Sequence, residues 1–377
     1  MHLRRLKNNL VIKRRPLVWL WLNIAVKIFG LVLVVLCGAS ALIWSIPTYG
    51  LEISEPVVAI SSRDFEYANG AKYQPDASIS VLNTATLNTW ILPMWDKEHG
   101  GIAHAKVYGT IDQPIKQVIW IKKKNELFKN ISKEFDGNYW IVNTYENEKG
   151  ILAFIHVENA QGTNIGRIGK SRLALAWSDD NGETFSFLGN IIEPFGDPAP
   201  FNVQGIPYII KDGYFYIYFH DVSGLTVARA RVEEVVSAAR SGTTSKWMKY
   251  AGPEFGFSSD GRGGKAKRIG IDGISHSDAA CSSYNNKCYL LLTRMNYGGG
   301  DSWIKLYESN NGVKWNYLQT IMREPTNNPT EGFQYVTILN KDGSDNSSVG
   351  REFIVYCYKD FQQSTRSIFR WVIDVSK

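Results

Sequence analysis

The chain has 377 residues, and a composition of 44% hydrophobic and 21% charged residues excludes both a disordered chain and a membrane protein with many spans. Seven of the 42 Lys and Arg residues lie within the first 50 positions, which hold no Asp or Glu. Residues 51–377 therefore carry 35 basic against 36 acidic groups, a balance that argues against a nucleic-acid-binding protein. The 13% aromatic content and the 33 Gly favour an all-β fold with many turns.

The first 56 residues are expected to hold a membrane anchor. Residues 28–46 contain no charged residue and are long enough to cross a bilayer. Residues 16–26 are also apolar, and Lys27 separates the two parts. The basic residues that precede it place the N-terminus in the cytoplasm and the rest of the chain on the other side. The alternative is a cleaved signal peptide, with residues 38–40 as its small-residue site. The expected parts are a cytoplasmic basic segment (1–15), a signal anchor (16–46), a linker (47–56) and an extracytoplasmic domain (57–377).

The remainder of the chain repeats a pair of strands. A strand rich in aromatic and β-branched residues is followed by a second strand that ends in a turn. The first strand of the pair recurs at 150–159, 214–223, 287–296 and 351–360, and residues 55–129 leave room for a fifth unit with strands at 90–95 and 116–124. Since one such unit cannot bury both of its faces, the repeat predicts an all-β, five-bladed β-propeller. A two-sheet sandwich is the alternative.

One segment departs from the strand pattern. Residues 232–242 (VEEVVSAARSG) have apolar positions at helical spacing and a glycine that can cap the end. We expect a helix there, inserted at the surface of the third unit.

Two turns share a sequence signature. Residues 178–185 (SDDNGETF) fit the pattern S-x-D-x-G-x-T-F, which is the Asp-box of sialidase-like propellers, and residues 309–315 (SNNGVKW) form a shortened version. In such a turn the Asp side chain accepts backbone N–H groups, Gly takes a positive φ and the aromatic residue packs between strands. The signature indicates blades and carries no chemistry of its own.

Cys281 and Cys288 flank a turn-like stretch, SSYNNK. They could face each other across a hairpin and form a disulfide in an oxidising compartment. The alternative is that both are buried free thiols, as expected for Cys357.

Polar residues near strand ends are the candidate functional residues, because the strands of a propeller converge on a central channel. Two carboxyl groups, one protonated and one ionised, are the minimum for cleaving a glycosidic bond, and a neighbouring His suits substrate binding. The candidate catalytic acids are Asp64, Glu158, Asp197, Asp278 and Glu331. The candidate substrate-binding residues are His156, His220, Asp221 and His276, and the candidate platforms for sugar rings are Trp95, Trp140 and Tyr216. No cofactor and no catalytic metal are expected, and the alternative use of the acids is to hold a structural Ca²⁺ ion.

The segments AFIHVEN, LALAWSDDNGETF, DGYFYIYFHD and HSDAACSSYNNKCYLLLTR resemble the five-bladed propeller glycoside hydrolases, the group of arabinanases and fructosidases. The resemblance spans most of residues 57–375. It implies three acids on separate blades that act as base, pKa modulator and general acid. By position, the resemblance implies Asp64 as the base, Asp197 or Asp278 as the modulator, and Glu158 or Glu331 as the acid.

We therefore expect a membrane-anchored, extracytoplasmic glycoside hydrolase that acts on a polysaccharide or glycan. The alternative is a non-catalytic propeller that binds a glycan or a partner for an envelope or exopolysaccharide assembly system. In either case the expected partners are a carbohydrate, as substrate or ligand, and the membrane, through the N-terminal helix, and no nucleic acid.

Overall fold

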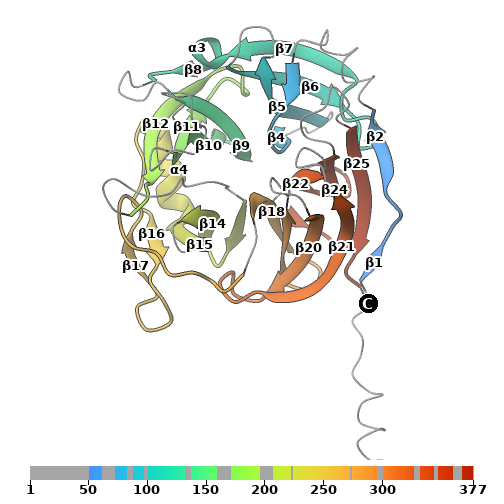
Figure 1. The fold of residues 1–377 in the computed structure, drawn as a ribbon. Coiled ribbons are helices and arrows are strands. Elements are labelled where there is room, and N and C mark those ends of the chain that lie inside the picture. The colour runs from blue at the N-terminus through green and yellow to red at the C-terminus, as the bar shows by residue number, and fades with distance from the viewer. Residues whose placement is uncertain are drawn as a thin grey trace, which may run out of the picture. The chain divides into compact units, whose positions relative to one another are not determined.

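The propeller is seen in a computed structural model, which describes residues 51–61, 73–82, 88–96, 101–131, 137–158, 171–195, 207–221, 224–271, 274–294, 300–326, 332–343, 347–359 and 367–376. Their strands form five separate sheets of five strands each. Figure 1 shows these sheets arranged radially around a common centre. The predicted five-bladed propeller is confirmed, and the two-sheet sandwich is wrong.

The blades are numbered I to V in chain order of their inner strands. Blade I contains β3 (Tyr73–Pro75), β4 (Ser80–Leu82), β5 (Asn88–Asp96), β6 (Ile102–Gly109) and β7 (Gln117–Lys123). Blade II contains β8 (Phe128–Lys129), β9 (Asn138–Asn147), β10 (Gly150–Glu158), β11 (Arg172–Ser178) and β12 (Phe185–Ile192), and the short helix α3 (Lys124–Leu127) precedes it. Blade III contains β13 (Tyr208–Lys211), β14 (Tyr214–Asp221), β15 (Gly224–Arg231), β16 (Met248–Tyr250) and β17 (Phe257–Asp260). Blade IV contains β18 (Ile274–Ser282), β19 (Cys288–Arg294), β20 (Gly300–Ser309), β21 (Asn316–Thr326) and β23 (Ser348–Val349). Blade V contains β22 (Phe333–Asn340), β24 (Glu352–Lys359), β25 (Ser367–Asp374), β1 (Glu52–Ile53) and β2 (Val57–Ile60).

The repeating aromatic strands found in the sequence are the second strands of their blades, not the innermost ones. They correspond to β10, β14, β19 and β24, and an inner strand precedes each of them, namely β9, β13, β18 and β22. The inner strands β9 and β18 carry buried polar residues, including Asn143 and Asp278. These residues interrupt the apolar pattern, which is why the inner strands did not stand out.

Strands from the two ends of the described chain close the ring in blade V. β25 pairs with β24 on one side and with β1 and β2 on the other, where Glu52 faces Asp374 and Val57 faces Arg370. Figure 1 shows β1 and β2, in blue, beside the red β25. β1 therefore lies within the stretch 47–56 that was expected to be a linker. The expected anchor, 16–46, falls outside the described residues. Among the residues that the structure describes, no helix is long and apolar enough to span a membrane.

The core consists of apolar clusters that lie between neighbouring blades. Phe154 of blade II and Phe215 of blade III pack with ring centroids 5.6 Å apart in one cluster. Tyr289 of blade IV and Phe353 of blade V are also 5.6 Å apart in another. Burial of apolar surface between blades stabilises the ring, and each blade depends on its two neighbours for that burial.

The sequence prediction of an Asp-box at 178–185 is confirmed by its hydrogen bonds. Asp180 Oδ1 accepts from the Thr184 backbone N–H (2.9 Å) and the Ser178 hydroxyl (2.7 Å), and the Gly182 N–H donates to Ser178 Oγ (2.9 Å). Gly182 has a φ of +76°, and a Cβ there would lie 3.0 Å from a methyl group of Leu82 in blade I. The Lys106 amine of blade I donates to the Asn181 carbonyl (2.8 Å). The turn therefore also fastens blade II to blade I.

We expect Asp180→Ala to lower the free energy of unfolding by about 1 to 3 kcal/mol, because it removes the acceptor for Thr184 and Ser178. Burial acts to raise the pKa of Asp180, but the hydrogen bonds from Thr184 and Ser178 outweigh it and the pKa lies below its usual value. Asp179→Ala is the matched control, because Asp179 is the exposed neighbour. Urea denaturation of both variants tests this, and equal losses would contradict it.

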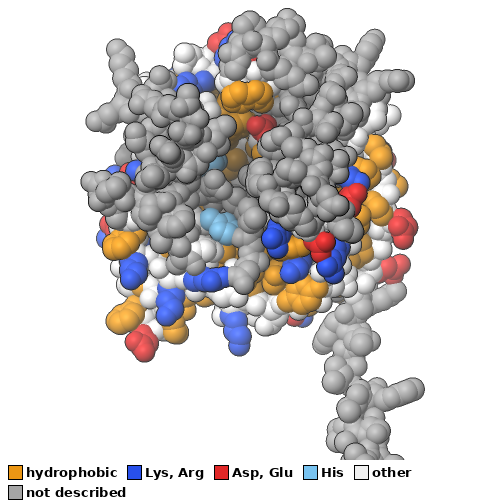
Figure 2. All heavy atoms as spheres, viewed as in Figure 1, with side chains coloured by type: hydrophobic (Ala, Val, Ile, Leu, Met, Phe, Trp, Pro, Cys, Tyr) orange, Lys and Arg blue, Asp and Glu red, His pale blue; other side chains and the backbone are white. Residues whose placement is uncertain are grey.

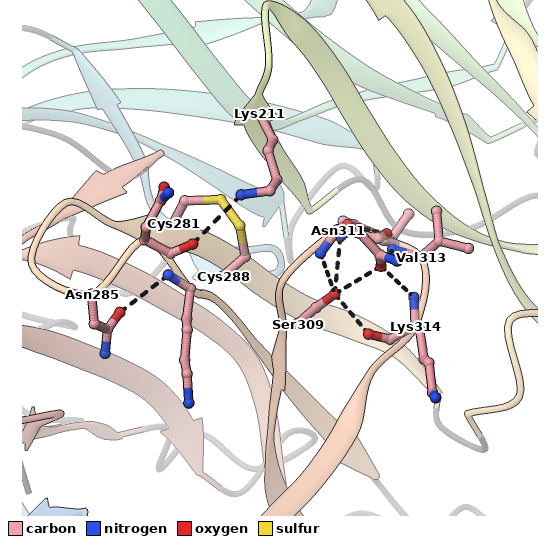
Figure 3. Close-up of a disulfide and its surroundings, with 12 residues drawn as sticks. Lys211, Cys281, Asn285, Cys288, Ser309, Asn311, Val313 and Lys314 are labelled. Carbon is pink, nitrogen blue, oxygen red and sulfur yellow. Dashed lines mark hydrogen bonds between the residues drawn. A yellow bond between two sulfur atoms is a disulfide. The ribbon is translucent and has the colours of Figure 1, made fainter.

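Figure 3 shows the shortened Asp-box beside a disulfide. Asn311 Oδ1 accepts from the N–H groups of Val313 (3.0 Å) and Lys314 (2.9 Å), as the sequence pattern predicted. Cys281 of β18 and Cys288 of β19 face each other across their hairpin and form a disulfide. The structure thus selects one of the two alternatives left open by the sequence.

The predicted helix is also confirmed. α4 (Val232–Arg240) lies between β15 and β16 of blade III and buries Val235, Val236 and Ala239. Gly242 follows with a φ of +76°, as expected for a glycine that ends a helix.

Candidate functional site

The candidate site lies at the end of the blades where the inner strands begin. Antiparallel pairing sets the end of a second strand beside the start of the inner strand, so Glu158 pairs with Asn138 and Lys359 pairs with Phe333. Strand ends from several blades therefore gather on one face of the ring. Figure 2 shows one face of the propeller, with histidine side chains, in pale blue, near its centre and basic side chains along one side.

Blades I and II are aligned by a hydrogen bond between their inner strands. The Thr144 hydroxyl of β9 donates to the carbonyl oxygen of Val81 in β4. Trp140 precedes Thr144 by four residues, and Ala77 precedes Val81 by the same number. Trp140 and Ala77 belong to one apolar cluster of buried residues.

Blade V is aligned with blade I in the same way. The Ile79 N–H donates to Thr337 Oγ1 of β22 (3.0 Å), and Tyr335 lies two residues before Thr337 as Ala77 lies two before Ile79. Tyr335 belongs to the cluster that contains Trp140 and Ala77. Blades V, I and II therefore bring one end of their inner strands together.

Asp76 is a carboxyl group at this place that the sequence analysis missed. It is half-buried, its backbone N–H donates to the Pro93 carbonyl (3.0 Å), and its Oδ1 accepts from the Tyr335 hydroxyl (2.9 Å). The available signal was an acid four residues before the start of β4, the short strand at which blade I bonds to the inner strands β9 and β22 of its neighbours. The sequence analysis placed the acid of this blade at Asp64 instead, and Asp64 lies outside the described residues.

Glu158 lies at the end of β10 and is half-buried. Its Oε2 accepts from Trp140 Nε1 at 3.2 Å, which ties it to the start of β9 in the same blade. His156 and Glu158 are half-buried on either side of the fully buried Val157, so the two lie on one face of β10. Trp140 belongs to the apolar cluster that also contains Tyr335, the donor to Asp76, so both carboxyl groups are bonded to members of one cluster.

Asp278 has a different setting, at the centre of the ring. It is only 2% exposed, and its Oδ2 accepts from the Ile338 N–H of blade V (2.7 Å). Its Oδ1 accepts from its neighbour Ala279 N–H (2.9 Å) and from Asn143 Nδ2 of blade II (3.3 Å). Burial raises the pKa of Asp278 to about 7, against the opposing effect of these donors. The carboxyl group thus ties blades II, IV and V together, and contact with substrate stays a prediction for it.

Two of the predicted substrate-binding residues, His220 and Asp221, lie in blade III. The structure describes the side chain of His220. Burial, with a smaller contribution from the positive charge of Arg268, lowers the pKa of His220 to about 4. The imidazole is therefore neutral at pH 7. Asp221 and His276 lie in β14 and β18, and their side chains fall outside what the structure describes. Asp197 and Glu331 lie outside the described residues altogether.

The aromatic platforms are largely unavailable to a sugar. Trp140 is 6% exposed and Tyr216 is 6% exposed, because both pack in clusters between blades. Their predicted role as platforms is wrong, and Trp140 instead holds Glu158. Trp95 is half-buried and remains a candidate.

Within the described ranges, no three His, Cys, Asp or Glu side chains are grouped so that they could hold a metal ion. The arrangement instead offers a pair of carboxyl groups, Asp76 and Glu158, each bonded to an aromatic donor.

No protein-family model matches the chain, and no curated protein matches it. Solved structures do match. The catalytic domain of the Coprinopsis cinerea GH62 alpha-L-arabinofuranosidase has a TM-score of 0.53 at 8% identity, covering 81% of this chain and 93% of that one. Zg3597, a family 117 glycoside hydrolase produced by the marine bacterium Zobellia galactanivorans, has a TM-score of 0.54 at 12% identity, covering 87% and 92%. The chain is thus a five-bladed β-propeller similar in fold to glycoside hydrolases.

Proposed function

We propose that the propeller hydrolyses glycosidic bonds of a polysaccharide or glycan, with Asp76 and Glu158 as its two reacting carboxyl groups. The observation that carries the proposal is that each carboxyl group accepts a hydrogen bond from an aromatic side chain, Tyr335 for Asp76 and Trp140 for Glu158, and that both aromatic side chains belong to one apolar cluster. Glycosidic cleavage needs one carboxyl group to protonate the leaving oxygen and another to activate water or attack the sugar.

In this proposal Asp76 is the base or nucleophile and Glu158 is the acid. The Tyr335 hydroxyl stabilises negative charge on Asp76, which suits a group that accepts a proton or attacks carbon. Trp140 Nε1 binds Oε2 of Glu158 and orients the group for proton transfer through its other oxygen. Asp64, Asp197 and Glu331 stay predicted members of the same site.

The fold supports the same class of substrate. The two similar structures described above are, by name, an alpha-L-arabinofuranosidase and a family 117 glycoside hydrolase. At 8% and 12% identity they do not identify the sugar. They favour a carbohydrate over other substrates for a propeller with paired carboxyl groups.

The test is to incubate the full chain in detergent with a panel of envelope and plant-type polysaccharides, and to measure reducing ends and binding together. Release of reducing ends above a heat-inactivated control is expected for at least one polysaccharide. Binding without release would overturn the hydrolase and leave the glycan-binding alternative.

We also propose that residues 16–46 anchor the propeller on the outer side of a membrane. The seven basic and no acidic residues of the first 50 support this orientation, and the Cys281–Cys288 disulfide suits an oxidising compartment. We expect the full chain in the membrane fraction after alkaline washing, and a chain that begins at Leu51 in the supernatant. A shortened chain that still sediments with membranes would contradict the anchor.

A further inference from the structure

Tyr335 has an unusual backbone conformation for its residue type. Its φ is +57°, and the other described non-glycine residues with a positive φ are Asn130, Asn181, Asp212 and Asn286. Asn and Asp enter this region readily in turns, whereas a bulky aromatic residue there is an outlier. Tyr335 also lies inside strand β22. A strained residue of this kind persists only where the surrounding structure holds it, and such residues cluster at functional sites.

The strain coincides with an extra residue in the strand. Gln334 faces Tyr358 and Thr337 faces Tyr356, so three steps along β22 correspond to two along β24. This is a β-bulge, and a bulge redirects the side chain beside it. Tyr335 is the residue whose side chain then reaches from blade V to blade I.

The redirected side chain ends on Asp76. The Tyr335 hydroxyl donates to Asp76 Oδ1 at 2.9 Å, although the two residues are 259 positions apart. The ring is 8% exposed and lies edge-on to Tyr358, with centroids 5.9 Å apart. The ring is therefore held by packing, and the hydroxyl is presented from a rigid support.

We propose that Tyr335 is a positioning residue that fixes the carboxyl group of Asp76 for reaction, an inference that rests on the proposed function. The hydroxyl restrains rotation of the carboxyl group about its Cβ–Cγ bond, so that the same oxygen faces the sugar in each turnover. Restraint of a reacting group in this way lowers the entropy that is lost on reaching the transition state. The β22 bulge supplies the geometry for it.

The first test is Tyr335→Phe in the full chain, which keeps the ring and removes the hydroxyl. With a polysaccharide that the wild type cleaves, we expect kcat to fall about 10- to 100-fold and KM to change less than about twofold. The acid limb of the pH–rate profile moves to higher pH, because negative charge on Asp76 loses its donor. Tyr317→Phe, at an exposed tyrosine of blade IV, is the matched control and leaves all three quantities unchanged.

The second test does not depend on finding a substrate. In protein labelled with ¹³C at the aspartate carboxyl groups, the signal that disappears in Asp76→Asn belongs to Asp76. We expect Tyr335→Phe to move its titration midpoint upward by about 0.5 to 1 pH unit. An unmoved midpoint overturns the inference. A moved midpoint with unchanged kcat overturns the positioning role. A wild type that cleaves no polysaccharide while the midpoint moves overturns the proposed function and leaves only the restraint of Asp76 by Tyr335.

Discussion

Replacing Asp278 with alanine is expected to lower the free energy of unfolding by about 3 to 5 kcal/mol, a large loss for one residue. The Ile338 N–H, the Ala279 N–H and Asn143 Nδ2 lose a shared acceptor inside the ring. Each buried donor left without a partner is destabilising, and the bond to Ile338 also connects blade IV to blade V.

Two variants serve as controls for Asp278→Ala. Asp278→Asn keeps one oxygen for two of the donors but turns an amide N–H₂ toward the Ile338 N–H, so an intermediate loss is expected. Ser80→Ala removes a fully buried hydroxyl that meets no hydrogen-bond partner among the described residues, so little loss is expected. Urea denaturation measures all three, and a loss for Asp278→Ala no larger than for Ser80→Ala would contradict the role given to Asp278.

The same carboxyl group makes stability depend on pH. Burial raises the pKa of Asp278 to about 7 in the folded protein, from 3.8 for an ordinary aspartate. The folded state therefore keeps a proton that the unfolded state releases, so the contribution is complete below about pH 4 and is lost as pH rises toward 7. The shift corresponds to at most about 4 kcal/mol. We expect the wild type to lose stability over this range relative to Asp278→Asn, and parallel curves would contradict the raised pKa.

The architecture can be predicted from the sequence because its signals are local. The aromatic strand pairs recur at a spacing that one blade explains, and the Asp-box at 178–185 is a pattern within one turn. The inner strands were not recognised because they contain Asn143, Asp278 and Thr337, polar residues that become buried only when other blades pack against them. In the sequence alone, polar residues at these positions indicate an exposed strand end.

Some residues of the candidate site could likewise be predicted from the sequence, and others could not. His156 and Glu158 were found because they alternate with a buried residue at the end of one strand. Asp76 was missed because its partner, Tyr335, lies 259 positions away and reaches it only through a bulge in another blade. Sequence reasoning also treated Asp278 as an acid near substrate, whereas three blades enclose it. Contacts across the ring depend on closure, and no local pattern contains them.

The largest expected effect on activity comes from the paired carboxyl groups. Glu158→Gln and Asp76→Asn are each expected to lower kcat on a cleaved polysaccharide about 100- to 10,000-fold, because each removes a group that transfers a proton or attacks the sugar. Gln at 158 keeps an oxygen for Trp140 Nε1, and Asn at 76 keeps one for the Tyr335 hydroxyl. The fold should therefore survive, with melting temperatures within about 3 °C of the wild type.

The two roles can be separated with substrates whose leaving group needs no proton. Glu158→Gln should recover most of its activity on an activated aryl glycoside, because proton donation to the leaving oxygen is then dispensable, whereas Asp76→Asn should remain inactive. Asp179→Asn, at an exposed residue of the Asp-box, is the matched control and should behave as the wild type. If both site variants keep wild-type rates while the polysaccharide is cleaved, the reacting acids must lie elsewhere, and the predicted Asp64, Asp197 and Glu331 become the next residues to replace.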